Sequence, residues 1–330
     1  MLKEKCSFFG KCGGCVWQDL SQADYLTKKE LFIRRAFADV GITKIPLKPI
    51  ILLPTGIRRR ACFAFYQGHL GFNETKSHKI VEITSCPLLE PELNNLIPDL
   101  RALVQKLGGA GDCFLLKTDA GVDIHIKDGR GIPDLKRLEI LGSLAQNRQI
   151  VRLMYNDSPI FQKEPLLYQA DTFLQPSRQG EKILVDLLLK NIGKAQKAVD
   201  LFCGYGTFTH PLEDMGLSVT GYDSDNRSVS TLGKMGQVRD LFRNPLSADE
   251  LSGIDLAVLD PPRAGAKEQV LQLAKTQIPK IIMVSCAPKT GARDIKILTD
   301  AGWHLTEITP VDQFTYSNHI EIVAVLEKSA

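Results

Sequence analysis

The sequence lacks the features that mark a membrane-spanning or secreted protein. No apolar run approaches the ~20 residues that a bilayer-spanning helix needs, and the opening MLKEKCSFFGKCGGC has no apolar core of a signal peptide. Repeats and low-complexity tracts are also absent. We therefore expect a cytoplasmic protein, in which the eight cysteines stay reduced and serve as ligands, nucleophiles or core residues.

A strong charge of one sign is absent too. The net charge of +3 is mild and does not by itself indicate a nucleic-acid partner. A hydrophobic content of 44% and a charged content of 24% are typical of a soluble globular protein, and 330 residues suffice for two domains. The local run Arg58-Arg59-Arg60 could bind phosphate through planar guanidinium groups, although a run of charge is also typical of a solvated face.

Cysteines are concentrated at the start of the chain, in the spacing Cys6-x5-Cys12-x2-Cys15. Two glycines between the last two cysteines allow the backbone to turn tightly, so that several thiolates can face one centre. A fourth ligand could be Cys86, which precedes a proline as cluster ligands often do, whereas we expect Cys62 and Cys113 to be core residues. Tetrahedral zinc and a [4Fe–4S] cluster both accept four thiolates, and the spacing does not separate them.

The pattern of hydrophobic residues changes along the chain. An amphipathic helix is expected at residues 19–40. An α+β module of modest size follows, with strands at 61–66, 113–118, 122–127 and 150–154 and helices at 91–107 and 135–145. From residue 180 the pattern alternates, with a helix at 181–189, strands at 197–203, 217–223, 254–260 and 281–286, and two more strands between 302 and 326. This alternation predicts a mostly parallel, doubly wound α/β sheet.

One predicted buried strand ends in a thiol. Residues 281–284 are apolar, as in a strand covered on both faces, and Pro288 cannot continue the ladder of hydrogen bonds. Ligands bind at the carboxyl ends of the strands in open α/β sheets. Cys286 is therefore expected to face a cleft. A small buried core residue is the alternative, because free cysteine is often buried.

A glycine loop follows the strand predicted at 197–203. Gly204 and Gly206 match the first part of G-x-G-x-x-G, but Thr209 stands in place of the third glycine, so a purely structural tight turn is the alternative. Asp223 ends the next strand, where a carboxylate can accept both hydroxyls of a ribose. With the later Asp260-Pro-Pro, this order favours S-adenosylmethionine over NAD, and Asp240 would lie near the adenine edge.

Several motifs, taken in order, carry a family resemblance. They are Asp200-Leu-Phe-Cys-Gly-Tyr-Gly206, Asp260-Pro-Pro-Arg263, Ser285-Cys286-x-Pro288 and His319-Ile-Glu321, preceded by Phe173-x-Gln175, Arg58-Arg59-Arg60-Ala61, Leu70-Gly-Phe72, Ser77-His78 and Cys86-Pro87. Together they resemble the signature set of the RNA 5-methyluridine methyltransferase family over nearly the whole chain. The resemblance implies a class I S-adenosylmethionine-dependent methyltransferase fold, Rossmann-like, with a smaller α+β domain that carries a four-cysteine cluster.

The resemblance also implies a reaction. Cys286 would add as a thiolate to C6 of a uracil, C5 would take a methyl group from S-adenosylmethionine, and Glu321 would remove the C5 proton so that Cys286 can leave. The implied cofactor-binding residues are Gln175, Phe202, Gly204, Thr207, Asp223, Asp240 and Asp260. The implied RNA-binding residues are Arg58, Arg59, Arg60, Arg263 and Phe173, the last of which would stack on an extruded base.

Members of the family with four such cysteines carry a [4Fe–4S] cluster, which implies one on Cys6, Cys12, Cys15 and Cys86. The family usually has Asn after the catalytic cysteine, whereas this chain has Ala287. Because the chain starts at the cysteines, we expect the N-terminal β-barrel RNA-binding domain of some members to be absent.

The expected organisation is a Cys-cluster segment and helix at residues 1–45, a central RNA-binding domain at 46–170 and a catalytic domain at 171–330. The expected function is that of a monomeric enzyme that forms 5-methyluridine at a specific uridine, first in 23S rRNA and alternatively in the T loop of tRNA. Arg263 argues against a base-amino methyltransferase, which would have an aromatic residue after Asp-Pro-Pro. The presence of both Cys286 and Glu321 argues against a non-catalytic RNA-binding protein of the same fold.

Overall fold

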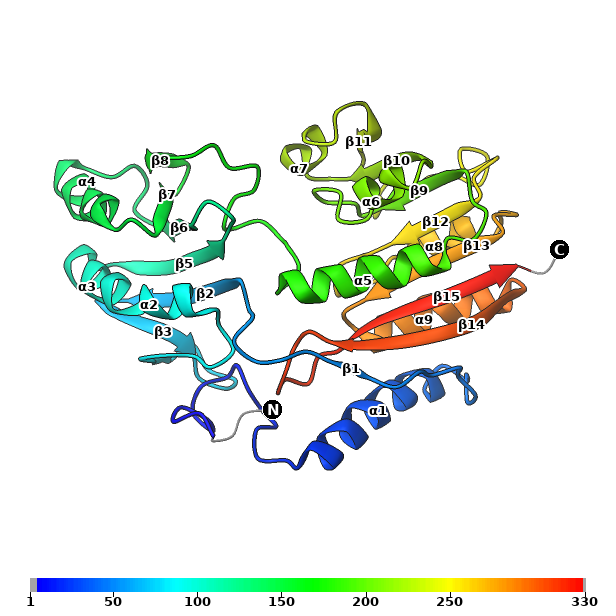
Figure 1. Cartoon of the computed structure of the whole chain (residues 1–330), viewed down its shortest axis with the longest axis horizontal. Helices are drawn as coiled ribbons and strands as arrows, with labels where there is room; N and C mark the ends of the chain where they lie inside the picture. Colours follow the sequence, from blue (N-terminus) through cyan, green and yellow to red (C-terminus); the bar gives the residue numbers. More distant parts are fainter. Residues whose placement is uncertain (1–4, 329–330) are drawn as a thin grey trace. The chain divides into compact units, whose positions relative to one another are not determined.

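The computed structural model describes residues 5–328, which are grouped into two compact units (Figure 1). Unit 1 comprises the chain up to Leu20, Pro54–Arg178 and Thr315–Ser317, and unit 2 comprises Ser21–Leu53, Gln179–Phe314 and the chain from Asn318 onward. These limits differ from the expected domain boundaries at 45/46 and 170/171, because residues 21–53 pack with the C-terminal part of the chain. Residues 1–4 and 329–330 of the expected domains lie outside the described range. Within that range no helix is both long and apolar enough to cross a membrane.

An eight-stranded sheet forms the centre of unit 2. Its strands lie in the order β1 (Ile51–Leu52), β14 (Trp303–Asp312), β15 (Glu321–Lys328), β13 (Lys280–Ser285), β12 (Leu256–Leu259), β9 (Lys197–Leu201), β10 (Ser218–Asp223) and β11 (Gly236–Val238). Neighbouring strands are parallel except in the two pairs that involve β15. The strands β12 and β13 are buried along almost their whole length, as parallel strands covered on both faces should be.

Helices cover both faces of this sheet. On one face α1 (Gln22–Ala38), α8 (Lys267–Leu273) and α9 (Pro288–Asp300) contribute Phe37, Val270 and Ile295 to a core shared with the strands. Figure 1 draws α5 (Arg178–Asn191) in front of the sheet and α8 and α9 behind it. The shorter α6 (Thr209–Asp214), α7 (Asn226–Ser230) and the 3₁₀ turn Gly233–Met235 follow β9 and β10. The observed sheet is the mostly parallel, doubly wound sheet that the sequence predicts.

The direction of winding reverses at β9. From β9 the chain builds β10 and β11 on one side, then crosses to β12 and β13 on the other. In open α/β sheets ligands bind outside the carboxyl ends of the strands at such a point. The residues that follow β9, β10, β12 and β13 therefore come together at one edge of the sheet.

The helix predicted at residues 19–40 is confirmed as α1, and it belongs to unit 2. The Ser21 side chain caps it by accepting a hydrogen bond from the Asp24 N–H (3.1 Å). Ile33 and Phe37 are completely buried on its inner face. After α1 the chain adds β1 to the edge of the sheet, with Ile51 opposite Val311 of β14. A strand of two residues is too short to show an alternating hydrophobic pattern, so this pairing could not be predicted from the sequence.

A seven-stranded sheet forms the centre of unit 1. The strand order is β4 (Ile80–Val81), β3 (His69–Asn73), β2 (Arg60–Tyr66), β5 (Ala110–Lys117), β6 (Val122–Asp128), β7 (Ile150–Tyr155) and β8 (Ser158–Gln162). The β6–β7 pair is parallel and the others are antiparallel. The helices α2 (Pro91–Asn95), α3 (Ile97–Leu107) and α4 (Leu135–Gly142) and the 3₁₀ turn Ser143–Gln146 complete the expected α+β module.

The prediction that Cys62 is a core residue is wrong. Side chains along β2 alternate between the two faces, and Phe63 and Phe65 occupy the buried one. Cys62 is therefore exposed, whereas Cys113 on β5 is buried as expected. The sequence also did not predict the short or edge strands β1, β3, β4, β8 and β11, nor the helix α9 after Cys286.

Candidate active site

Cys286 and Glu321 lie at the same edge of the sheet of unit 2. Cys286 follows the last residue of β13, and Glu321 is the first residue of β15. The two strands are antiparallel, and Ser285 pairs with Ile322. Cys286 and Glu321 therefore each come one residue beyond the same pair. On its other side Glu321 pairs with Val311 of β14.

Burial controls the protonation of both groups. It raises the pKa of the Cys286 thiol to about 11; the charges of Glu321 and Asp260 add to the rise, and the charge of Arg263 opposes it. Burial and the charge of Asp260 also raise the pKa of Glu321 well above its usual value, while a hydrogen bond with Gln313 opposes that rise. A raised pKa makes the Glu321 carboxylate a stronger proton acceptor, as the task of a general base requires. The thiol needs positive charge nearby to ionise, and Arg263 supplies it.

Arg263 belongs to the turn after β12 that also contains Asp260. The Asp260 N–H donates to the Leu201 carbonyl (3.2 Å), which joins the ends of β12 and β9. Thr290 on α9 donates to the Arg263 carbonyl (2.9 Å), and the exposed Arg263 Nη2 lies 3.3 Å from Nε2 of His319. The turn is thus tied to the helix that starts just after Cys286.

The loop between β9 and α6 has a strained backbone. Phe202, Gly204 and Gly206 have φ angles of 66°, 51° and 84°, in the left-handed region that favours glycine. A Cβ at Gly206 would lie 2.5 Å from a methyl group of Leu232. The Gly204 N–H donates to Oδ2 of Asp223 at 3.0 Å. The structure therefore brings the predicted glycine loop and the predicted ribose-binding acid into contact.

Thr209, which stands where the G-x-G-x-x-G motif has its third glycine, forms a buried hydrogen bond with Asp200. Its hydroxyl donates to Oδ2 of Asp200 (2.7 Å), and both side chains are completely buried. The other carboxyl oxygen, Oδ1, has no hydrogen-bond partner within residues 5–328. Burial raises the pKa of Asp200 to about 7, with the charge of Asp223 adding to the rise and the Thr209 bond opposing it. A buried carboxyl group that is half satisfied beneath a glycine loop fits a ligand that brings a donor or a positive charge.

Three other predicted cofactor residues lie around this loop. Thr207 is half-buried within it. The Phe202 ring lies 5.3 Å from the Phe242 ring. Asp240 follows β11, and its Oδ1 accepts the N–H groups of Phe242 (3.0 Å) and Arg243 (3.2 Å). The structure thus gathers Phe202, Thr207 and Asp240 near the carboxyl ends of β9, β10 and β11.

In unit 1 Arg59 contacts the backbone of the segment that contains Phe173 and Gln175. Its own N–H donates to the Pro176 carbonyl (2.9 Å), and its Nε donates to the Gln175 carbonyl (3.0 Å). Arg59 is 7% exposed and Gln175 is 3% exposed. Arg59 is thus committed to protein acceptors rather than standing free on a surface.

Arg60 contacts the same segment. Its Nη1 donates to the Leu174 carbonyl (2.8 Å), and its guanidinium carbon lies 5.4 Å from the centre of the Phe173 ring. Phe173 itself is 67% exposed. Arg59 and Arg60 together fix the backbone from Leu174 to Pro176 and leave the aromatic ring of Phe173 open to solvent.

The four predicted cluster cysteines are half-buried neighbours in unit 1. Burial raises the pKa of Cys15 to about 11 and also raises the pKa values of Cys12 and Cys86; the charges of neighbouring thiols add to each rise. The charge of Arg58 lowers the pKa of Cys15 and Cys86. The donor chemistry and the nearby positive charge suit an anionic thiolate cluster. However, the part of the chain that the structure describes contains no group of three or more His, Cys, Asp or Glu side chains arranged to hold a metal ion.

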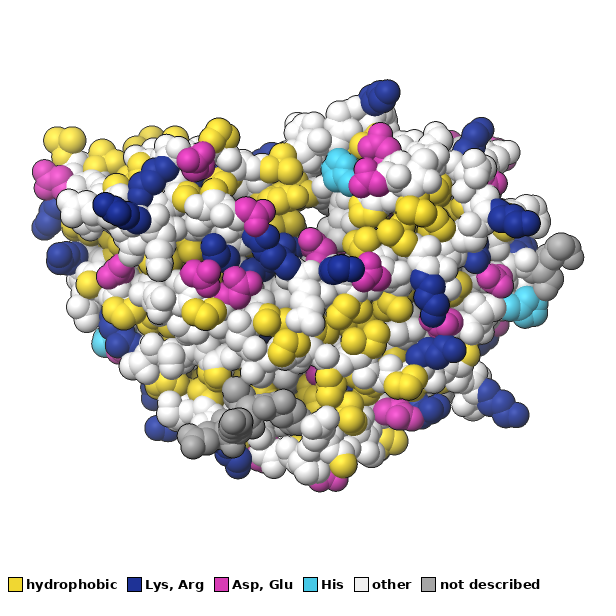
Figure 2. Space-filling model, in the orientation of Figure 1, with side chains coloured by type: hydrophobic (Ala, Val, Ile, Leu, Met, Phe, Trp, Pro, Cys, Tyr) yellow, Lys and Arg dark blue, Asp and Glu magenta, His cyan; other side chains and the backbone are white. Residues whose placement is uncertain are grey.

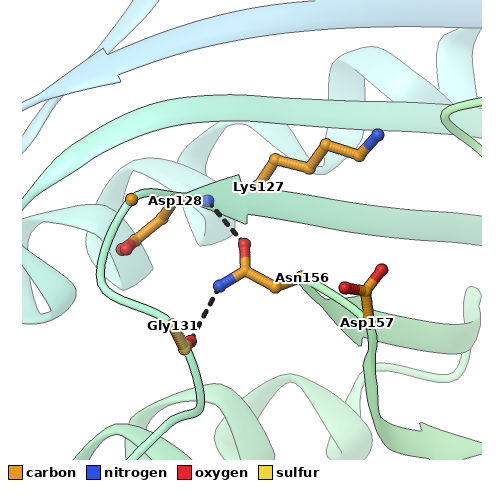
Figure 3. A pocket seen from close by; sticks show the side chains of 6 residues that line it. Lys127, Asp128, Gly131, Asn156 and Asp157 are labelled. Carbon is orange, nitrogen blue, oxygen red and sulfur yellow. Dashed lines mark hydrogen bonds between the residues drawn. The ribbon is translucent and has the colours of Figure 1, made fainter.

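Unit 1 also has an open pocket of about 620 Å³ that the sequence did not predict. It is lined by Lys127, Asp128, Gly129, Gly131, Asn156 and Asp157 (Figure 3). The Asn156 amide spans it, bonded to the Asp128 N–H (2.8 Å) and the Gly131 carbonyl (2.7 Å). These bonds hold the turn after β6.

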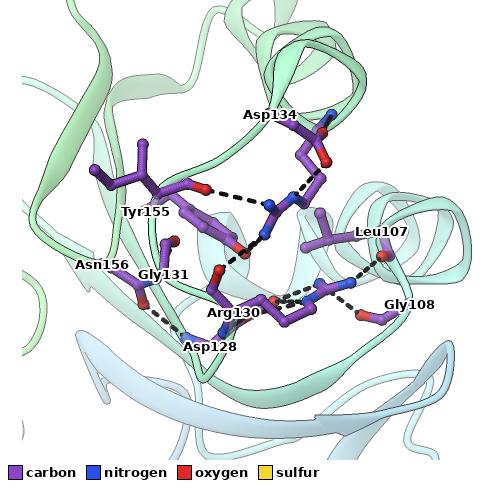
Figure 4. Close-up of polar contacts among 10 residues, drawn as sticks. Leu107, Gly108, Asp128, Arg130, Gly131, Asp134, Tyr155 and Asn156 are labelled. Atoms are coloured by element: carbon purple, nitrogen blue, oxygen red, sulfur yellow. Dashed lines mark hydrogen bonds and ion pairs between the residues drawn. The ribbon is translucent and has the colours of Figure 1, made fainter.

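Arginines beside this pocket are also bound within the unit (Figure 4). Arg130 pairs with Asp128 and donates to the Leu107 carbonyl (3.0 Å), and Arg137 donates to the Tyr155 hydroxyl (3.2 Å). On the face shown in Figure 2, basic and acidic side chains are interspersed. The arginines of this region therefore give no evidence of a strongly basic RNA surface.

Sequence reasoning missed Gln313. This residue is 4% exposed and hydrogen-bonds to the Glu321 carboxyl group. In the sequence it is a polar residue that follows Asp312 at the end of β14, a pattern that is also typical of a loop.

Comparison with known proteins gives consistent matches. A family model described as tRNA (Uracil-5-)-methyltransferase matches residues 234–329. An uncharacterized RNA methyltransferase of Agrobacterium fabrum is 34% identical over 97% of this chain and 83% of that protein. The 23S rRNA (uracil(1939)-C(5))-methyltransferase RlmD of Vibrio parahaemolyticus is 27% identical over 98% of this chain and 82% of that protein.

A solved structure matches most of the chain. The crystal structure of Pyrococcus abyssi tRNA (uracil-54, C5)-methyltransferase in complex with S-adenosyl-L-homocysteine aligns with a TM-score of 0.73 at 22% identity. The alignment covers 95% of this chain and 85% of that chain. The fold predicted from the sequence, a class I methyltransferase fold with a Rossmann-like sheet, is confirmed by this likeness.

Proposed function

This chain belongs to the RNA uracil-5-methyltransferase family, and on that basis we propose that it forms 5-methyluridine at a specific uridine through a covalent Cys286 adduct. The observation that carries the proposal is the register of β13 and β15. It brings a thiol and a buried carboxyl group to one edge of the sheet, beside the turn that holds Asp260 and Arg263.

The proposed reaction assigns one task to each of these side chains. The Cys286 thiolate adds to C6 of uracil, and the electrons of the C5–C6 double bond make C5 nucleophilic. After C5 has taken the methyl group, Glu321 removes the C5 proton. The electrons of that C–H bond restore the double bond and expel the thiolate. Arg263 stabilises the thiolate by its charge.

S-adenosylmethionine would supply the electrophilic methyl group. We assign its binding to the edge formed by Gly204, Asp223 and Asp240, with Phe202 and Thr207 beside them. The unsatisfied Oδ1 of Asp200 and the hydrogen bond from the Gly204 N–H to Asp223 support this assignment. Gln175 and Asp260 remain predicted contacts.

We assign RNA binding to unit 1. The exposed Phe173 ring, held by Arg60, is suited to stack on an extruded base. We further propose ribosomal RNA as the substrate, because a relative that is 27% identical over 98% of this chain is named for 23S rRNA. Transfer RNA is the second candidate.

Nucleoside mapping by mass spectrometry tests the proposal. Ribosomal and transfer RNA are compared from cells with the gene, without it, and with a Cys286→Ala copy. We expect 5-methyluridine to disappear from one position of the large-subunit RNA and to return with the wild-type gene alone. A loss confined to transfer RNA would overturn the substrate assignment. An unchanged pattern in both RNAs would overturn the proposed activity.

We also propose that Cys6, Cys12, Cys15 and Cys86 bind a [4Fe–4S] cluster. Their mutual proximity and the positive charge of Arg58 support this assignment. Binding requires the thiol groups to move into a common ligand set, which the short segment with Gly13 and Gly14 can allow.

A further inference from the structure

A lysine is completely buried in unit 2. Lys29 on α1, Tyr25 one turn before it and Asp312 at the end of β14 are all 0% exposed. The Lys29 ammonium group lies 2.9 Å from Oδ1 of Asp312, and the Tyr25 hydroxyl donates to Oδ2 of the same carboxylate. Lys29 also donates to the backbone carbonyl of His319.

Stability alone is a weak reason for such a group of residues. Removing a lysine and a carboxylate from water costs several kcal/mol per ion, and well-packed apolar side chains of similar volume often serve as well or better. Several neighbouring positions of α1 contribute apolar side chains to the core, among them Ile33 and Phe37. The position of Lys29 is therefore better explained by the part of the chain that its ammonium group binds.

The ammonium group of Lys29 binds residues at the two ends of the connector between β14 and β15, which comprises residues 313–320. Asp312 lies directly before this connector, and His319 lies two residues before Glu321. Gln313, which follows Asp312, hydrogen-bonds to the Glu321 carboxyl group. One ammonium group thus holds the Asp312 side chain before the connector and the His319 carbonyl within it. Asp312 is one residue from Gln313, and His319 is two residues from Glu321.

The structure assigns to Lys29, with Tyr25 and Asp312, the role of positioning Glu321 for removal of the C5 proton. The inference rests on the proposed function, because it concerns the base of that reaction. Lys29 is a positioning residue, since it acts through the Asp312 carboxylate and the His319 carbonyl rather than on the reacting atoms. Orientation matters at this step because a displacement of about 1 Å can cost on the order of 10²-fold in rate.

The test separates addition of Cys286 from its elimination. The probe is the unmodified transcript of the RNA identified by the mapping experiment, made once with uridine and once with 5-fluorouridine. Fluorine at C5 cannot be removed as a proton, so the fluorinated RNA reports only formation of the adduct. The variants are Lys29→Met, Lys29→Met/Asp312→Asn and Tyr25→Phe, with Glu321→Gln as the reference.

We expect Lys29→Met to form the adduct on fluorinated RNA at nearly the wild-type rate. On uridine RNA it should accumulate adduct on denaturing gels, as is expected of Glu321→Gln, and turn over about 10- to 100-fold more slowly. The double variant removes both charges and should regain melting temperature without regaining turnover, since the His319 carbonyl still lacks its donor. Tyr25→Phe, which removes one hydroxyl, should show a smaller effect in the same direction.

The control for simple loss of stability is Gln269→Leu. Gln269 is fully buried in the same unit, and its side-chain amide bonds to the N–H (2.7 Å) and carbonyl (3.1 Å) of Leu246. It should lower the melting temperature without accumulating adduct. Normal turnover in the double variant, or adduct accumulation in Gln269→Leu, would overturn the inference. An absence of adduct in Glu321→Gln would overturn the base assignment and the inference together.

Discussion

Cys286 and Glu321 lie one residue beyond the same antiparallel pair, so backbone hydrogen bonds between β13 and β15 set their relative position. The reversed direction of β15 makes this possible. Its amino end lies at the edge where the parallel strands finish, and a residue at the start of a strand can there meet one at the end of another. The sheet itself is thus the scaffold on which the proposed nucleophile and base are aligned.

Replacing Cys286 by alanine should abolish methylation, by at least about 10³-fold, because the proposed nucleophile is removed and Cys203, which follows β9, is buried. Binding of S-adenosylhomocysteine, measured by calorimetry, should persist. Cys62→Ala is the matched control, since Cys62 is an exposed thiol in unit 1 with no part in the proposed reaction. Full methylation by Cys286→Ala would rule out the covalent mechanism.

Arg263→Ala should slow adduct formation at pH 7 by about 3- to 10-fold. The reason is that the charge of Arg263 lowers the pKa of the Cys286 thiol, which burial has raised to about 11. The defect should shrink as the pH rises toward that value, because both proteins then carry thiolate. Stopped reactions with 5-fluorouridine RNA between pH 6 and pH 10 measure the rate, and Arg263→Lys should retain most of it. An equal loss at every pH would indicate a role in RNA binding instead.

Asp200 should make the ligand-free protein less stable as the pH rises. Its folded pKa of about 7 exceeds the ~3.9 of an unfolded chain. Its contribution to the free energy of unfolding, on the order of 4 kcal/mol, is therefore fully present below about pH 4 and is lost as the pH rises through about 7. Asp200→Asn keeps an acceptor for Thr209 and should gain melting temperature relative to wild type at pH 8 but not at pH 5. Parallel calorimetric profiles for the two proteins would contradict this expectation.

Arg60→Met should impair turnover more than it changes the salt dependence of RNA binding. The Arg60 guanidinium is bonded to the Leu174 carbonyl and lies against Phe173, so its loss loosens the segment without removing a phosphate contact. Phe173→Ala combined with Arg60→Met should be little worse than Phe173→Ala alone. A fall of about one in the slope of log affinity against log salt would instead identify Arg60 as a phosphate ligand.

Protein purified without oxygen should be brown, with absorbance near ~400 nm. Cys12→Ser or Cys86→Ser should lose the colour and the iron together, whereas Cys62→Ser should keep both. Metal analysis provides the check. A colourless protein with one zinc per chain would replace the iron–sulfur assignment by a tetrahedral zinc site.

The sequence predicted those parts of the site that depend on local patterns. Gly204, Asp223 and Cys286 each follow or end a strand with a clear apolar signal, and parallel strands place such residues at one edge. The roles of Arg59 and Arg60 were not predictable, because a run of arginines looks the same whether it faces phosphate or backbone carbonyls. Gln313 and Lys29 were missed because their contacts depend on the pairing of β14 with β15 and on the packing of α1.

The pairing of β1 with β14 has a consequence for how this protein is made. Ile51 leaves the ribosome long before Val311, its partner at the edge of the sheet. During that interval α1 and β1 must remain without the strands that they cover, exposing residues such as Phe37. Unit 2 can therefore close only after β14 and β15 have been synthesised, and the nascent segment with α1 and β1 is where a holding chaperone would be needed most.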